Sequence, residues 1–219
     1  MHWANETSYN QIADVMPLYQ LKNNFLITKL EEYNSIEELI IPLKSHTSLR
    51  HSIKSKPHKW GINVFAQAGV SGYIYDSEMY FGKGTNTASN PELGMSGNVV
   101  IRLIRNLPRH TSFKLFIDNW FTSLNLAVKL RNEEMYVVGT IRKNRLGGCR
   151  LKTDTEMKKE CRGTCDYRRD EKEIIILKWY YNKTVHLIST YKGKEPVENV
   201  ECWSKNSRVY IDIPHRNIV

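Results

Sequence analysis

The clearest chemical candidate in this chain is Asp118, a carboxylate that directly follows a short alternating apolar run. Residues 113–117 predict a strand, and the apolar positions after it predict a helix that begins at Thr122 or Ser123. In α/β proteins ligands gather beyond the carboxyl ends of strands, so this carboxylate could bind a metal ion or act as a general base. An aspartate that only caps a turn is the alternative, and the residues themselves leave both open.

The elements around Asp118 predict an α/β fold. A meander of three strands comes first, then helix, strand, helix and strand, expected at residues 35–41, 60–68, 73–81, 96–107, 113–117, 123–132 and 135–141. A glycine-rich turn at 69–72 makes the second and third strands antiparallel. Such an order predicts a mixed sheet covered by helices. Trp60 is expected to pack beneath this sheet.

The two ends of the chain do not follow this order of strands and helices. Residues 1–32 predict helix, with an apolar stripe that one helix cannot bury alone. Residues 143–170 are charged and rich in turns, and 172–181 and 183–191 predict a strand pair around Asn182. Another strand is expected at 198–205, and residues 211–219 are expected to be extended because Pro214 bars a helix.

Composition excludes several classes of protein. The 219 residues include no apolar run as long as a membrane span, and the polar start has no signal core, so an intracellular protein is expected. Four cysteines are too few for a disulfide framework. They are expected to be isolated thiols; a zinc site built on Cys161 and Cys165, with Cys149 and His186, is the less favoured alternative.

The charge balance favours a polyanionic partner. Net charge is +9, from 32 basic and 23 acidic residues. Two basic groups could contact phosphates, and a solvated charge run is the alternative for each: Lys44, Arg50, Lys54, Lys56 and Lys59, and then Arg142, Lys143 and Arg145. Trp120 and Phe121 could stack on an unpaired base, but core packing against the next helix is the favoured interpretation.

A series of short motifs resembles the piggyBac-type transposases in order and approximate spacing. The resemblance covers residues 15–219. Its main motifs are Tyr33-Asn34-Ser35-Ile36-Glu37-Glu38, Lys56-Pro57-His58-Lys59-Trp60-Gly61, Ile117-Asp118-Asn119-Trp120-Phe121-Thr122-Ser123 and Val138-Gly139-Thr140-Ile141-Arg142-Lys143-Asn144-Arg145.

This resemblance implies a ribonuclease-H-like core interrupted by a mostly β insertion lobe. By that comparison, residues 1–32 are a remnant of the helical DNA-binding and dimerisation lobe. Residues 33–142 are the catalytic core, 143–197 the insertion lobe, and 198–219 a truncated return segment toward the core.

The resemblance also implies a metal site. The family uses three aspartates to hold Mg²⁺ or Mn²⁺ for phosphoryl transfer. Asp118 matches the second, and Glu37 falls on the first, so these two are the expected catalytic and metal-binding residues. The third lies beyond Val219 in a Gly-Gly-Val-Asp context, and its role is not carried over to Asp212. Glu37 keeps the charge but adds a methylene, and Glu38 should point to the opposite face of the strand.

The expected function is therefore that of a transposase-derived, nuclear protein that is catalytically inactive and binds DNA without sequence preference. An active transposase whose C-terminal part lies in a longer product is one alternative. A protein-interaction module that has lost DNA binding is another. Mg²⁺ or Mn²⁺ is expected only if the site is functional, and a homodimer is expected only for the full-length family.

Overall fold

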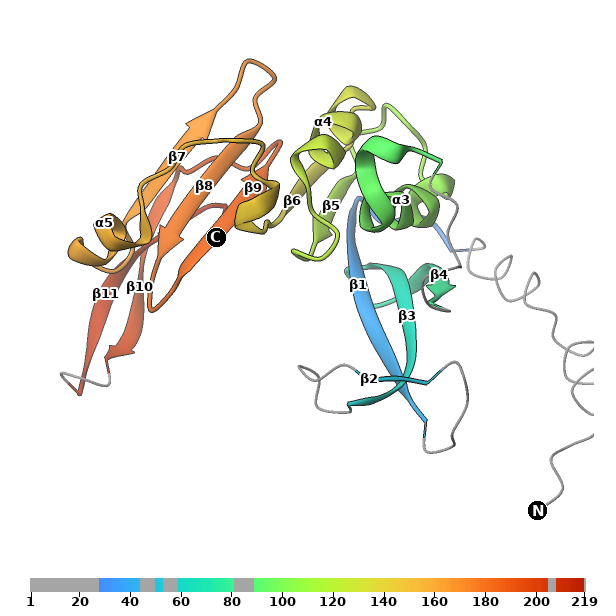
Figure 1. Cartoon of the computed structure of the whole chain (residues 1–219), viewed down its shortest axis with the longest axis horizontal. Coiled ribbons are helices and arrows are strands. Elements are labelled where there is room, and N and C mark those ends of the chain that lie inside the picture. Colours follow the sequence, from blue (N-terminus) through green and yellow to red (C-terminus); the bar gives the residue numbers. More distant parts are fainter. Residues whose placement is uncertain (1–27, 44–49, 53–58, 81–88, 205–207, 219) are drawn as a thin grey trace, which may run out of the picture. The chain divides into compact units, whose positions relative to one another are not determined.

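The computed structural model describes residues 28–43, 50–52, 59–80, 89–204 and 208–218 (Figure 1). Most of the helical stripe expected in residues 1–32 lies outside this part. The chain divides into two compact units. The first comprises Met1–Thr85 and Leu103–Leu107, and the second comprises Asn86–Arg102 and Pro108–Val219.

The first unit is built on the antiparallel meander that the sequence predicted. Strand β3 (Trp60–Gly69) pairs along one edge with β1 (Tyr33–Pro42) and along the other with β4 (Ile74–Met79). The turn before β4 contains Gly72 at φ 81°, a left-handed conformation that favours glycine. A two-residue strand, β2 (His51–Ser52), pairs with the start of β3 and was not predicted.

The second unit contains a mixed sheet with the strand order β5-β6-β9-β8-β7. Strands β5 (Lys114–Ile117) and β6 (Tyr136–Thr140) are parallel, because helix α4 (Leu124–Asn132) carries the chain back between them. Strand β6 then pairs antiparallel with β9 (Thr184–Ser189). The predicted α/β class is thus confirmed at the level of a mixed sheet with few helices, and the ribonuclease-H-like arrangement stays a prediction.

The charged stretch 143–170 holds more regular structure than the sequence indicated. It contains the 3-10 turn η3 (Lys143–Arg145), helix α5 (Asp154–Lys159) and strand β7 (Cys165–Arg169), which pairs with β8 (Ile175–Tyr180). Strands β8 and β9 form the predicted hairpin around Asn182. The sequence patterns did not reveal α5 and β7, because a short helix and an exposed strand need few apolar residues.

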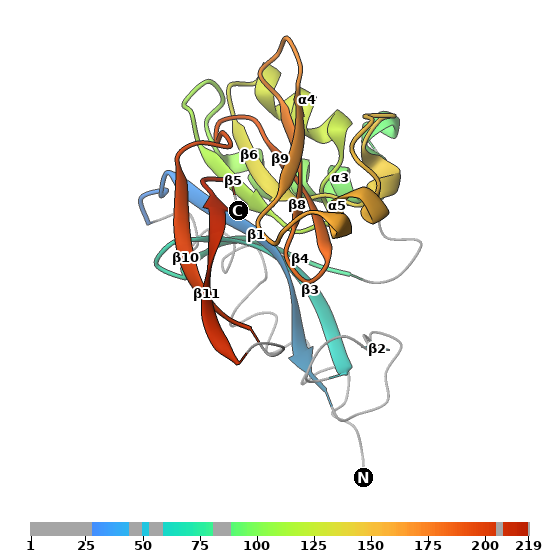
Figure 2. The same ribbon diagram turned by 90° about the vertical axis from the view of Figure 1, so that its left-hand side faces the viewer.

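The remaining elements are short helices and a hairpin. Two 3-10 turns, η1 (Pro91–Leu93) and η2 (Ile104–Asn106), flank helix α3 (Gly94–Leu103), so the predicted helix 96–107 ends in a tighter turn. Strands β10 (Val197–Ser204) and β11 (Val209–Arg216) pair with each other in a separate two-stranded sheet (Figure 2).

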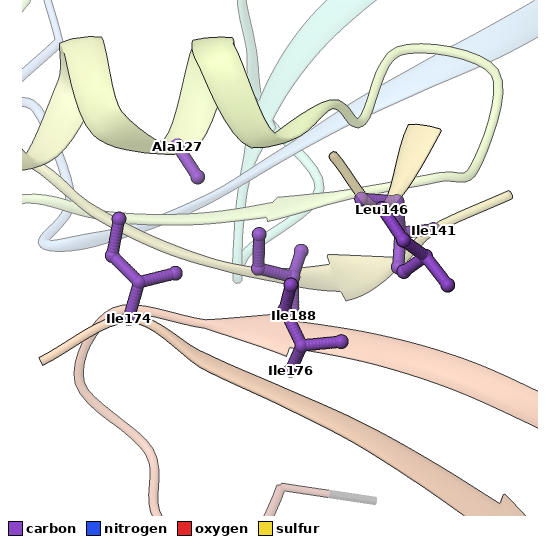
Figure 3. Close-up of a cluster of buried hydrophobic side chains, with 6 residues drawn as sticks. All are labelled: Ala127, Ile141, Leu146, Ile174, Ile176 and Ile188. Carbon is purple, nitrogen blue, oxygen red and sulfur yellow. The ribbon is translucent and has the colours of Figure 1, made fainter. Parts of the chain in front are cut away.

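Two apolar clusters cover opposite faces of the β6-β9-β8 region. Neighbouring residues Ile176 and Leu177 belong to different clusters, as the alternation of a strand requires. Figure 3 shows the first cluster, in which Ala127 of α4 points toward Ile174, Ile176 and Ile188. This packing anchors α4 on the sheet and fixes the segment between β5 and α4.

Candidate functional site

Asp118 lies at the carboxyl end of β5 with its side chain exposed. Its backbone oxygen accepts hydrogen bonds from the amides of Phe121 at 3.0 Å and Thr122 at 3.1 Å, and from the Thr122 hydroxyl at 2.8 Å. Its carboxylate Oδ1 accepts a bond from Thr140 Oγ1, at the end of β6, at 3.3 Å. The turn is therefore held by the backbone of Asp118, and its carboxylate lies at the surface near the ends of both strands.

Helix α4 begins as the sequence predicted. Ser123 is its N-cap residue, with extended backbone, and its hydroxyl accepts a hydrogen bond from the Leu126 amide at 3.2 Å. This bond satisfies one of the amides that a helix start leaves without a partner. The cap fixes where the turn after Asp118 ends.

The two aromatic residues after Asp118 have different environments. Phe121 is fully buried, which confirms the expected core packing for this residue. Trp120 is half-buried, and its ring meets that of Phe121 edge-on with centroids 4.8 Å apart. Base stacking by Trp120 stays a prediction.

A cavity of about 550 Å³ lies beside this turn, entirely within the second unit. The Asn125 amide joins two of its walls by donating to the Glu92 carbonyl at 3.0 Å. Its walls come from η1, the first turns of α3 and α4, the turn before α4, and η3 with the residues after it, and they include Leu93, Met95, Ser96, Trp120, Leu124 and Arg145.

The basic run after β6 divides into outward and inward side chains. Arg142 and Lys143 are exposed, and Arg142 Nε donates to Asn119 Oδ1 at 3.1 Å. Arg145 is half-buried and bonded to the protein, and burial, together with the charge of Arg142, lowers the pKa of its guanidinium. Sequence inspection missed this difference, because nothing in the run itself distinguishes the two arginines. Their role in DNA binding stays a prediction.

Glu37 lies in β1 of the first unit, with its side chain exposed beside Leu39 on one face of the strand. Glu38 faces the other way, and its Oε1 accepts a hydrogen bond from Asn63 Nδ2 at 2.7 Å. The predicted alternation of these two glutamates is thus confirmed. That Glu37 meets Asp118 at one metal site stays a prediction.

The first basic group is described only in part. Lys44, Lys54 and Lys56 lie outside the described residues. Lys59 is exposed, and the Arg50 guanidinium lies 4.7 Å from the centre of the Trp60 ring. Trp60 is 51% exposed, so the expectation that it packs beneath the sheet was wrong; it instead forms a surface cation–π pair.

The donors around Asp118 fit a hard divalent cation in kind but do not complete a site. Mg²⁺ prefers carboxylate oxygen and is often bound through one or two carboxylates together with substrate phosphates. In the described part of the chain no three His, Cys, Asp or Glu side chains form a metal-binding group. All four cysteines are free thiols, and burial raises the pKa of Cys149. Asp118 would supply one carboxylate to such an ion, and a second one from Glu37 stays a prediction.

Comparison with known proteins identifies the lineage. A family model described as "Transposase IS4" matches residues 4–215. Human PiggyBac transposable element-derived protein 3 is 30% identical over 220 residues, which cover 99% of this chain and 37% of that protein. Human PiggyBac transposable element-derived protein 2 is 31% identical over 205 residues, covering 90% of this chain and 34% of that protein. The chain belongs to the piggyBac transposase family. It spans about a third of the length of these relatives.

A solved structure of the family has the same fold. The cryo-EM structure of a piggyBac transposase synaptic complex with hairpin DNA matches with a TM-score of 0.68 and 20% sequence identity. The match covers 88% of this chain and 42% of that one. The described part of this piggyBac family chain contains no helix long and apolar enough to cross a membrane.

Proposed function

We propose that this chain is part of a transposase-derived nuclear protein that binds DNA without sequence preference and has lost strand cleavage. The observation that carries the proposal is the exposed Arg142 beside the Asp118 turn, followed in the chain by the exposed Lys143. Arg142 reaches this turn through its bond to Asn119. Cations at this position would contact the phosphates next to any scissile bond held at Asp118.

Elementary electrostatics supports the binding half of the proposal. Each lysine or arginine that neutralises a phosphate releases condensed counterions, which gives affinity without sequence preference. The net charge of +9 adds long-range attraction. The solved relative named above is a complex with hairpin DNA, which is consistent with this partner.

The loss of cleavage is argued from Glu37. This residue occupies the position where the family resemblance expects the first aspartate. The additional methylene moves the carboxylate outward by about 1.5 Å, whereas Mg²⁺ requires near-octahedral ligands at about 2.0–2.1 Å. In a ribonuclease-H-like arrangement this displacement would fall at the metal, and a misplacement of about 1 Å can reduce the rate about 10²-fold.

The experiment is a salt titration of binding to a short labelled DNA duplex, followed by fluorescence anisotropy. Wild type should bind more weakly as salt rises, with a linear dependence of log K on log salt. The double variant Arg142→Gln, Lys143→Gln should reduce this slope by about 1.8, because each lost phosphate contact contributes about 0.9. Lys172→Gln, in the exposed turn between β7 and β8, is the matched control and should leave the slope unchanged.

Two results would overturn the proposal. Absence of binding at low salt would exclude DNA as a partner and favour a protein-interaction module. Cutting of the duplex in the presence of Mg²⁺ or Mn²⁺, abolished by Asp118→Ala, would show an active transposase. We expect salt-dependent binding and DNA strands that stay uncut in the presence of either Mg²⁺ or Mn²⁺.

A further inference from the structure

We propose that Arg145 is a positioning residue that fixes the turn carrying Asp118, and that it makes no phosphate contact. Charge and spacing had placed it in the DNA-binding group with Arg142 and Lys143. The proposal deepens the function proposed above, and only the DNA arm of its test rests on that function.

One nitrogen of Arg145 joins two separate elements. Nη1 donates to the backbone oxygen of Trp120 at 2.7 Å and to that of Thr122 at 3.1 Å, and it lies 3.3 Å from Ser96 Oγ. Trp120 and Thr122 belong to the turn between β5 and α4, whereas Ser96 is a buried residue of α3. The guanidinium therefore ties the turn to a helix that precedes it in the chain.

The acceptors explain why a cation is needed at this position. Thr122 is fully buried, so water has little access to its carbonyl. An unsatisfied buried carbonyl costs more than a hydrogen bond contributes, and bonds from a charged donor are the stronger ones. Burial of the guanidinium is the main cause of its lowered pKa, as expected for a charge that has exchanged water for protein dipoles.

Through this turn Arg145 acts on Asp118 without touching its carboxylate. The two oxygens that it binds belong to residues 120 and 122, and the amides of residues 121 and 122 bond back to the Asp118 oxygen. The same turn presents Trp120 to the cavity. Removal of the guanidinium would free the turn, and with it the direction of the Asp118 side chain.

A phosphate contact would compete with this role. The hydrogens of Nη1 are directed to protein acceptors, so a phosphate contact made by Nη1 would leave two carbonyls unpaired, and the half-buried side chain offers a phosphate less access than that of Arg142. Arg142 has the opposite geometry, because its side chain is exposed and donates to the side-chain oxygen of Asn119. Arg142 and Arg145 carry the same charge three positions apart, so equivalent substitutions of the two can be compared directly.

The first arm of the test is hydrogen exchange of backbone amides in the whole chain. Arg145→Gln should accelerate exchange at Phe121 and Thr122 by about tenfold or more, because their bonds to Asp118 open locally. Exchange at Leu177 in β8 should not change. Arg142→Gln should leave all three amides as in wild type. Arg145→Lys should restore most of the protection, since an ammonium has three hydrogens and can donate to the same oxygens.

The second arm is the salt titration of DNA binding. Arg142→Gln should reduce the slope by about 0.9, and Arg145→Gln should leave it unchanged. An equal reduction by Arg145→Gln with normal exchange at Phe121 and Thr122 would overturn the proposal and make Arg145 a phosphate contact. Equal acceleration of exchange throughout the second unit would overturn it as well, because it would show a general loss of stability. If wild type bound no DNA, the proposed function would fail, while the exchange arm would still decide the role of Arg145.

Discussion

The Asp118 turn and the start of α5 are both held in place by a basic side chain, but the two sites treat its charge differently. Each joins a basic side chain to backbone oxygens, Arg145 to those of Trp120 and Thr122, and Lys178 Nζ to that of Lys152 at 2.6 Å. At α5 a carboxylate completes the joint, because Lys178 also pairs with Asp154 at 2.6 Å. At the Asp118 turn the acceptors of Arg145 within the described residues are two backbone oxygens and a hydroxyl, and none of them is a carboxylate. The Lys178–Asp154 pair at the start of α5 is neutral overall, whereas Arg145 at the Asp118 turn keeps its positive charge.

This difference separates a structural joint from a surface suited to a polyanion. Lys178 is only 2% exposed in β8, and a buried cation without a counter-charge would be very costly. The joint holds a helix of six residues, too short to persist alone, whose start is further fixed by the capping box of Thr153 and Glu156. Arg142, beside the Asp118 turn, and the following Lys143 are exposed, so phosphates can reach them.

The largest effect that tests this comparison is expected when the Asp154 carboxylate, which pairs with Lys178 at the start of α5, is removed. Asp154→Ala should lower the free energy of unfolding by about 1–3 kcal/mol, because it leaves the Lys178 ammonium buried without its counter-charge. The estimate allows for the partial exposure of Asp154, at 51%. Urea unfolding measures the loss. Lys178→Met added to Asp154→Ala should recover most of it, and an equally unstable double variant would show that the pair is not the joint.

A smaller effect is expected at the Asp118 turn, where the cap is local. Ser123→Ala should cost about 1 kcal/mol, since α4 loses the hydroxyl that accepts from the Leu126 amide. Ser123→Asp should retain the stability of wild type, because a carboxylate also caps a helix start. The same urea curves provide the comparison, and an equal loss in both variants would mean that the hydroxyl does not act as the cap.

The smallest effect concerns pH. His186 of β9 lies directly opposite Lys178, and burial first, then the Lys178 charge, lowers the pKa of its imidazole; Asp154 opposes this and Lys143 adds to it. The unfolded chain therefore binds a proton near pH 6.5 that the folded chain binds only at lower pH. The contribution of the neutral His186 to the free energy of unfolding should be fully present above about pH 7, and it should be lost as the pH falls below about 6.5.

Thermal melts at several pH values check the effect of His186. His186→Gln should give a flatter profile between about pH 7 and 5 than wild type. If His186→Gln leaves the dependence of stability on pH unchanged, His186 does not cause that dependence. Asp154 has a pKa lowered mainly by its bond to Lys178, so its own contribution is lost only at more acidic pH.

Much of the framework around the candidate site could be predicted because it depends on local patterns. Alternation in β1 separated Glu37 from Glu38, and the glycine turn gave the β3–β4 pair. The sequence was less informative where charged residues hide the apolar periodicity of an element or lie beside an aromatic ring. Helix α5 and strand β7 carry mostly charged and polar side chains, and the exposed Trp60 ring pairs with the Arg50 guanidinium at the surface.

By itself, the sequence determined that Asp118 ends a strand and precedes a helix, because alternation, helical periodicity and a serine cap act within a few residues. Only the tertiary structure decided which basic side chains are joints and which remain available. Arg145 reaches Ser96, 49 positions away, and Lys178 reaches Lys152, 26 positions away. The direction of a charged side chain is set by acceptors that folding brings to it, and no spacing along the chain contains that information.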